Sequence, residues 1–111
     1  MSKFDEKIAL YTESFNQLGI SFDADLFHKV TKGLGPSIYK TDAEKVSCSQ
    51  ASEMETVKKN FLMKKLGFED SPKLDDALKA ACEKMGQSNR NKYRAMFYYL
   101  LVKELGAEDK Y

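Results

Sequence analysis

The longest apolar run of the chain is AMFYYLLV, from Ala95 to Val102. A membrane-spanning helix needs ~18 or more apolar residues, so this run is far too short to cross a bilayer. It lies in a stretch near 89–105 that is apolar on nearly all sides through its middle, which is typical of a helix surrounded by other helices. We therefore predict a helix near 89–105 at the centre of a bundle, packed on every side.

Four further stretches on the N-terminal side of this run have helical spacing. In the first, apolar residues recur from Phe4 to Leu18 at intervals of four, three, four and three, which is one stripe of a helix. No alternating strand pattern with turn residues is present, so the sequence predicts an all-α fold, a compact bundle of about five helices with the C-terminal helix central. The four predicted helices cover residues 3–18, 23–32, 49–66 and 72–85.

The ends of these helices carry local signals. Glycine follows the last apolar position at Gly19, Gly67 and Gly106, where it can take the left-handed conformation that closes a helix. Ser71-Pro72 predicts a helix start, with serine as the cap and proline in the first turn. Three further positions are predicted in the same way, Gly33 and Gly86 as stops and Asp23 as a cap.

Composition limits the class of protein. The chain has 111 residues, 42% of them hydrophobic, which predicts one domain over residues 1–111 with a real core. The formal net charge of +1 gives no overall field toward nucleic acid or an anionic membrane. The beginning of the chain lacks the apolar run of a secretory signal, so we expect a cytoplasmic protein without membrane attachment. In that compartment Cys48 and Cys82 are expected to be reduced thiols rather than a disulfide, although a bridge is left open.

The start of the last predicted helix is the most specific candidate for a binding site. Cations in the first turns oppose the helix dipole, so an anionic ligand would explain them. Free backbone N–H groups and arginine side chains can hold a phosphate or a partner's carboxylate. The competing interpretation is that the arginines pair with Asp75, Asp76 or Glu83 on a neighbouring helix. The candidate anion- or partner-binding residues are Ser88, Asn89, Arg90, Lys92 and Arg94.

A second basic group lies in the predicted helix 49–66. It consists of Lys58, Lys59 and Lys65. On a helical wheel, Lys58 and Lys65 fall beside apolar positions, so their stems are expected to cover apolar surface while the ammonium groups reach water. If this face adjoined the arginine face, the two would form a basic patch suited to a nucleic-acid backbone.

Catalytic chemistry finds little support in the residue types. His28 is the single histidine, and no nucleophile signature accompanies it. The Gly-rich stretch 33–37 lacks the Gly-Lys-Ser/Thr of a phosphate-binding loop and is interpreted as a turn between helices. Cys48 is a candidate reactive thiol at a predicted helix start. We expect no catalytic residue, metal or cofactor, and hence no enzyme.

Four motifs carry a family resemblance that extends over nearly the whole chain. They are KGLGPSIY at 32–39, VSCS at 46–49, ETVKKNFL at 55–62 and SNRNKYRA at 88–95. Together they resemble a small bacterial family catalogued as domain of unknown function 2853. The resemblance implies a bacterial, cytoplasmic, single-domain helical protein, and it implies no activity, ligand or catalytic residue.

The sequence thus predicts a non-enzymatic module that binds another protein or a second copy of itself. One small core does not readily hold all three of the side chains of Met54, Met63 and Met96. A methionine left at the surface favours an adaptable apolar contact patch. The alternative function is binding of nucleic acid or a phosphoanion through the basic start of the last helix. Aromatic side chains at 93 and 97–99 could stack on bases, but we expect at least Phe97 to be core.

Overall fold

The computed structural model describes residues 3–40, 44–86 and 92–110. Within these ranges all regular elements are helical, which confirms the predicted all-α class. The α-helices are α1 (Lys3–Leu18), α2 (Ala24–Gly33), α3 (Ala51–Val57), α4 (Pro72–Met85) and α5 (Arg94–Glu104). Short 3₁₀ helices cover Gly35–Tyr39 and Glu108–Lys110, and a π-helical segment covers Lys58–Lys65.

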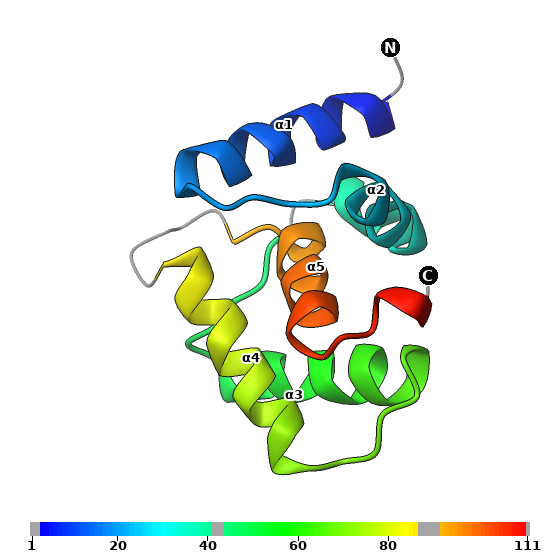
Figure 1. The fold of residues 1–111 in the computed structure, drawn as a ribbon, viewed down its shortest axis with the longest axis vertical. Coiled ribbons are helices and arrows are strands. Elements are labelled where there is room, and N and C mark those ends of the chain that lie inside the picture. Colours follow the sequence, from blue (N-terminus) through cyan, green and yellow to red (C-terminus); the bar gives the residue numbers. More distant parts are fainter. Residues whose placement is uncertain (1–2, 41–43, 87–91, 111) are drawn as a thin grey trace.

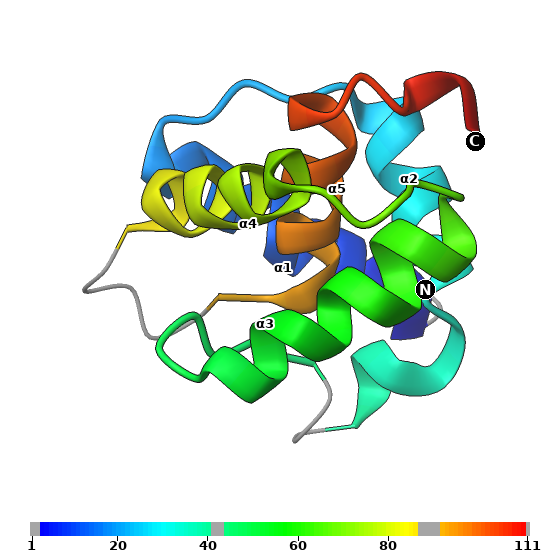
Figure 2. The same cartoon turned by 90° about the horizontal axis from the view of Figure 1, so that it is seen from below.

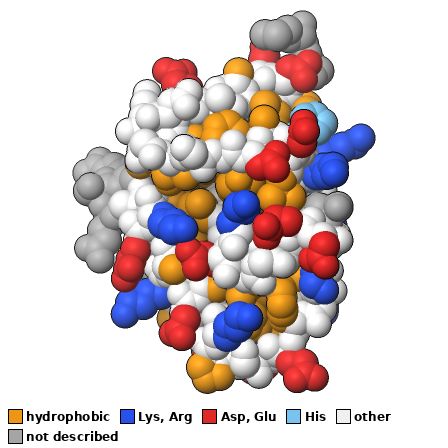
Figure 3. Space-filling model, in the orientation of Figure 1, with side chains coloured by type: hydrophobic (Ala, Val, Ile, Leu, Met, Phe, Trp, Pro, Cys, Tyr) orange, Lys and Arg blue, Asp and Glu red, His pale blue; other side chains and the backbone are white. Residues whose placement is uncertain are grey.

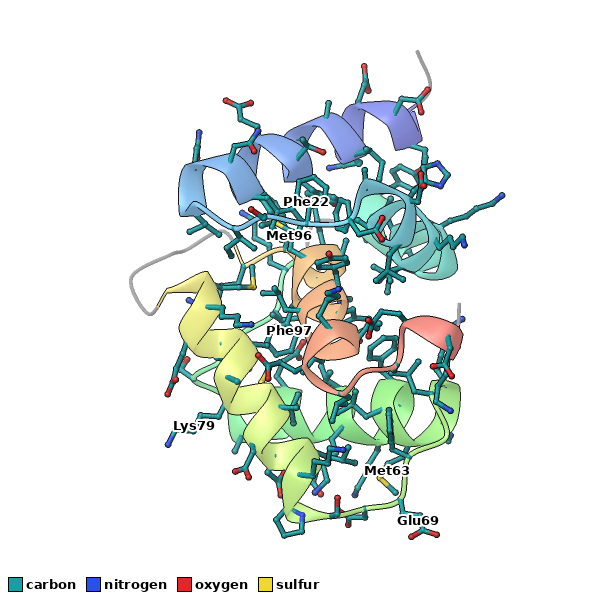
Figure 4. The ribbon with its side chains drawn as sticks, viewed as in Figure 1. Phe22, Met63, Glu69, Lys79, Met96 and Phe97 are labelled. Carbon is teal, nitrogen blue, oxygen red and sulfur yellow. A yellow bond between two sulfur atoms is a disulfide. The ribbon has the colours of Figure 1, made fainter. Side chains whose placement is uncertain are left out.

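The C-terminal helix α5 lies in the middle of the bundle, as predicted. Figure 1 shows α1 and α2 on one side of it and α4 and α3 on the other. Eight consecutive residues of α5, Ala95 to Val102, are buried, and the helix packs against α4, α2 and α1. Phe97 is fully buried between α4 and α5, so the prediction that it belongs to the core is confirmed (Figure 4).

Aromatic rings fill the space between α1, α2 and α5. Phe15, Phe27 and Tyr99 meet edge to face at centroid distances of 5.1 to 5.8 Å, and Phe22 stacks on Phe15. Such pairs contribute stabilisation beyond the burial of apolar area. Tyr93, Tyr98 and Tyr99 are all buried, so their rings do not form an exposed stacking surface.

The helix stops confirm most of the glycine predictions. Gly19 and Gly106 take left-handed φ values of 70° and 63°. The residue after each glycine donates its N–H back into the helix, from Ile20 to the carbonyl of Phe15 at 3.0 Å and from Ala107 to Val102 at 2.9 Å. These are the bonds of the Schellman motif. The prediction for Gly33 is wrong, because α2 includes Gly33 and the left-handed residue is Gly35.

Two of the predicted helices differ in detail. The helix predicted over 49–66 is one rod in space, but it changes from α3 to the π-helical segment at Lys58 (Figure 2). The last helix begins at Arg94 rather than near Asn89. The backbone before it is engaged elsewhere, since the N–H of Val46 bonds to Lys92 O at 2.8 Å and the N–H of Arg94 bonds to Glu44 O at 2.6 Å. Residues 87–91 lie outside the described residues.

The expectation of two reduced thiols is wrong for this structure. Cys48 and Cys82 form a disulfide, with their Cα atoms 6.0 Å apart. Cys48 lies in the turn before α3 and Cys82 lies on α4, so 34 positions of sequence separate two residues that tertiary packing brings together. The spacing of the two cysteines along the chain carries no information on this contact.

The methionines divide between the core and its edge. Met96 is fully buried in α5, whereas Met54 and Met63 are half-buried against the core. None of the helices described is long and apolar enough to cross a membrane.

Candidate functional site

The predicted anion site is described only in part. Ser88, Asn89 and Arg90 lie outside the described residues. Lys92 is half-buried, and its carbonyl accepts the N–H of Val46. The remaining candidate, Arg94, is the first residue of α5 and only 16% of its side chain is exposed.

Arg94 is held by side chains of two helices. Its guanidinium donates to Glu53 Oε1 in α3 at 2.9 Å and to the hydroxyl of Tyr98 at 3.0 Å, one turn along α5. This partly buried arginine–carboxylate pair links α3 to α5. The structure therefore places Arg94 against Glu53, and not against the residues of α4 that the sequence suggested as partners.

The second basic group is also close to carboxylates. Lys58 lies 2.7 Å from Asp70 and 3.2 Å from Asp75, and these two hydrogen bonds raise its pKa above the ordinary value. Lys59 pairs with Glu55 one turn earlier, at 3.0 Å. Lys65 is exposed at the end of the π-helical segment. The Arg94 guanidinium thus faces Glu53 in α3. The Lys58 ammonium group faces Asp75 at the beginning of α4 and Asp70 in the loop before it.

A partly buried polar cluster that the sequence did not indicate joins α1 to the segment before α3. Glu44 Oε2 accepts from Lys7 Nζ and from the hydroxyl of Tyr11, each at 2.6 Å, and only 12% of the Glu44 side chain is exposed. The ring of Tyr93 lies 4.8 Å from that of Tyr11. Glu44 follows no motif in the sequence, so only the tertiary structure brings these residues together.

The tyrosines of this cluster are held in their neutral form. Burial raises the pKa of Tyr11 far above its usual range, and the hydrogen bond to Glu44 and the charge of Glu44 add to the shift. Burial and the Glu44 charge also raise the pKa of Tyr93, while the charge of Lys7 opposes that shift. Tyr11 therefore acts as a hydrogen-bond donor to a carboxylate and not as a base.

We expect Tyr11 to make the fold sensitive to alkali. Its pKa is raised in the folded state above the 10.0 of a free tyrosine, so its contribution is complete below pH 10 and is lost as the pH rises above that value. The urea midpoint of the wild type should fall steeply above pH 10, and that of Tyr11→Phe should fall less steeply. Tyr11→Phe should also be less stable at pH 8 by about 1–2 kcal/mol, because the bond to Glu44 is lost.

Tyr39→Phe is the control, because Tyr39 is 43% exposed and its charge is the smallest of the causes that raise the pKa of Tyr11. This variant should keep most of the alkaline fall of the wild type. Equal slopes for Tyr11→Phe and the wild type would contradict the assignment.

A hollow of about 170 Å³ opens between α2, the π-helical segment and α5. We call it the Tyr98 hollow. Its apolar walls are Val30 and Leu34 from the α2 side and Phe61 from the π-helical segment. The residues that line it are Val30, Gly33, Leu34, Asn60, Phe61, Lys65 and Tyr98.

The aromatic wall of the Tyr98 hollow is a pair of stacked rings. The rings of Phe61 and Tyr98 stack with centroids 4.0 Å apart, and the Arg94 guanidinium lies 5.6 Å from the centroid of the Tyr98 ring. The polar side chains at its rim, Asn60 and Lys65, are both exposed. The arrangement offers an apolar recess with an amide and a cation at its edge.

The surface charge is mixed on the face that Figure 3 shows. Lysine and arginine side chains alternate there with aspartate and glutamate, and apolar surface lies between them. Among residues 3–40, 44–86 and 92–110, no three histidine, cysteine, aspartate or glutamate side chains come together as a metal site would require.

Comparison with known proteins places the chain in a family. A family model described as "Protein of unknown function (DUF2853)" matches residues 11–109. No curated protein matches the chain. The matched range includes every residue that lines the Tyr98 hollow.

Proposed function

The chain belongs to the DUF2853 family, whose description assigns no activity, and we propose that it is a non-enzymatic protein-binding module that takes one apolar side chain of its partner into the Tyr98 hollow. Membership confirms the resemblance carried by the sequence motifs. The family leaves the function open, so the proposal depends on the geometry of the chain itself.

The observation that carries the proposal is the π-helical wall of the hollow. In the segment Lys58–Lys65 the backbone is wound one residue wider than in an α-helix, as in the bond from Leu66 N–H to Phe61 O at 2.9 Å. π-helical turns are rare and frequently occur at functional sites. Here the segment supplies Asn60, Phe61 and Lys65 to one recess.

The size and chemistry of the hollow favour a side chain as its occupant. Sites for drug-sized ligands and cofactors occupy about 300–1,000 Å³, which is well above the volume found here. One leucine or phenylalanine side chain of a partner suits a recess lined by Val30, Leu34 and Phe61.

Nucleic-acid or phosphoanion binding stays a prediction from the sequence, and the geometry favours it less. Arg94, Lys58 and Lys59 each have a carboxylate oxygen within 3.0 Å. A phosphate at any of these positions would have to displace an existing ion pair. Such binding would weaken by about one logarithmic unit per contacted phosphate for each tenfold rise in salt.

The proposal is tested by selecting peptides from a random displayed library against the purified protein. We expect the selected peptides to share one leucine, phenylalanine or methionine. Asn60→Trp places a large side chain at the exposed rim and should weaken binding at least tenfold, which corresponds to about 1.4 kcal/mol.

Lys79→Trp is the matched control. Lys79 is an exposed residue of α4 that points away from the bundle in Figure 4 and does not line the hollow. The Lys79→Trp variant should bind the selected peptides with the affinity of the wild type. Failure to select any such peptide, or equal affinities for Asn60→Trp and the wild type, would refute the proposal, and salt-dependent capture of oligonucleotides alone would favour the alternative.

A further inference from the structure

The disulfide lies at the edge of the core, where solvent reaches it. Cys48 and Cys82 are both half-buried, whereas the residues that form the centre of the core are almost fully buried. Cys48 is in a turn followed by the exposed residues Ser49 and Gln50. Thiol–disulfide exchange requires access to a sulfur atom, and the half-buried position of both cysteines leaves part of each residue open to solvent.

Noncovalent contacts hold the same segment independently of the disulfide. On one side of Cys48, the backbone of Glu44 and Val46 is bonded to Arg94 and Lys92. On the other side, Glu53 in α3 is paired with Arg94. Both ends of the segment are therefore attached to the beginning of α5 by bonds that do not depend on the sulfur atoms.

Cys82 is additionally placed by its own surroundings. It lies in α4, where Ala81 and Met85 are fully buried, and its Sγ is 3.8 Å from the Sδ of Met54. A thiol at this position keeps a polarizable neighbour and the packing of its helix. Cys82 can therefore leave the disulfide without leaving its place in the structure.

We propose that Cys48–Cys82 is a redox-active site that exchanges with dithiols while the chain remains folded. A thiolate of the dithiol attacks Cys48 Sγ, the bond between the two cysteine sulfurs breaks, and Cys82 leaves as a thiolate that takes a proton from water. The second thiol of the dithiol, as a thiolate, then attacks the dithiol sulfur that is bonded to Cys48. This attack breaks the mixed disulfide and releases Cys48 as a thiolate, which takes a proton from water. Two electrons pass from the dithiol, which becomes a cyclic or internal disulfide, to the two cysteines, which become thiols.

The first experiment uses the wild-type full chain with dithiothreitol as the dithiol. After reduction without denaturant, alkylation should add two groups to the intact mass, while the helical circular dichroism signal is retained at 25 °C. Removal of the reductant and addition of oxidised dithiothreitol should restore the bond. Opening of the bond only in parallel with loss of the helical signal would overturn the proposal.

The second experiment tests which sulfur is attacked. The wild type is treated briefly with reduced glutathione, the thiols released are alkylated, and peptide mass spectrometry locates the mixed disulfide. Glutathione should be found on Cys48 at least ten times as often as on Cys82. Equal amounts on the two cysteines would overturn the assignment of Cys48 as the attacked sulfur.

Discussion

Replacement of Phe97 by alanine is expected to lower the free energy of unfolding by about 3–5 kcal/mol, because it removes a fully buried ring and leaves a cavity that the surrounding helices fill only in part. Phe97 lies in α5, the helix that packs against α4, α2 and α1. Urea unfolding followed by circular dichroism measures the change.

Phe97→Leu is the control for this substitution. It keeps most of the apolar volume and should cost much less than the alanine variant, about 1–2 kcal/mol. If Phe97→Ala lost less than about 1 kcal/mol, the ring would not be the core element that its burial indicates.

Removal of the disulfide in the double variant Cys48→Ala/Cys82→Ala is expected to cost about 3–4 kcal/mol. The bond closes a loop spanning 34 positions, and in the chain-entropy model a loop of that length removes this much conformational freedom from the unfolded chain. The fall should appear as a lower urea midpoint when the variant is compared with the oxidised wild type.

The reduced wild type is the matched control, because it lacks the bond but keeps both sulfur atoms. Its urea midpoint should be close to that of the double variant. Domains are typically stable by about 5–15 kcal/mol, so both forms are expected to remain folded, as the proposed redox activity requires. An unchanged midpoint in the double variant would show that the bond does not restrict the unfolded chain.

The architecture could be predicted because its signals are local. The apolar stripe from Phe4 to Leu18 matches α1, and Ser71-Pro72 marks the beginning of α4 at the residue where it starts. The apolar run at 95–102 indicated a surrounded helix, and α5 is that helix. Periodicity and capping act within a few residues along the chain, so they can be recognised without knowledge of the fold.

The change from α3 to the π-helical segment at Lys58 was not predictable in this way. Both windings keep an apolar side facing the core, and the apolar spacing over 49–66 is satisfied by either. The beginning of α5 was missed for a similar reason. The residues near 92–94 pair with the backbone at 44–46, and a segment nearly 50 positions away leaves no trace in the local pattern.

The residues of the candidate sites show the same division. The sequence alone identified Arg94, Lys58 and Lys65 as basic candidate residues. It also identified Phe61 and Tyr98 as apolar or aromatic positions of their helices. Their partners were not, since Arg94 meets Glu53 and Lys58 meets Asp70 and Asp75 across turns of the chain. The Tyr98 hollow combines residues 30–34, 60–65 and 98, which no single window of sequence contains.

Most helix positions, most helix stops and the burial of α5 therefore follow from the chain alone, because backbone hydrogen bonding and apolar periodicity are short-range. The tertiary structure decided that Cys48 reaches Cys82, that Glu44 lies beneath Lys7 and Tyr11, and that the basic side chains face carboxylates. These contacts depend on how whole helices pack, and packing is determined by the sum of many weak interactions over the entire core.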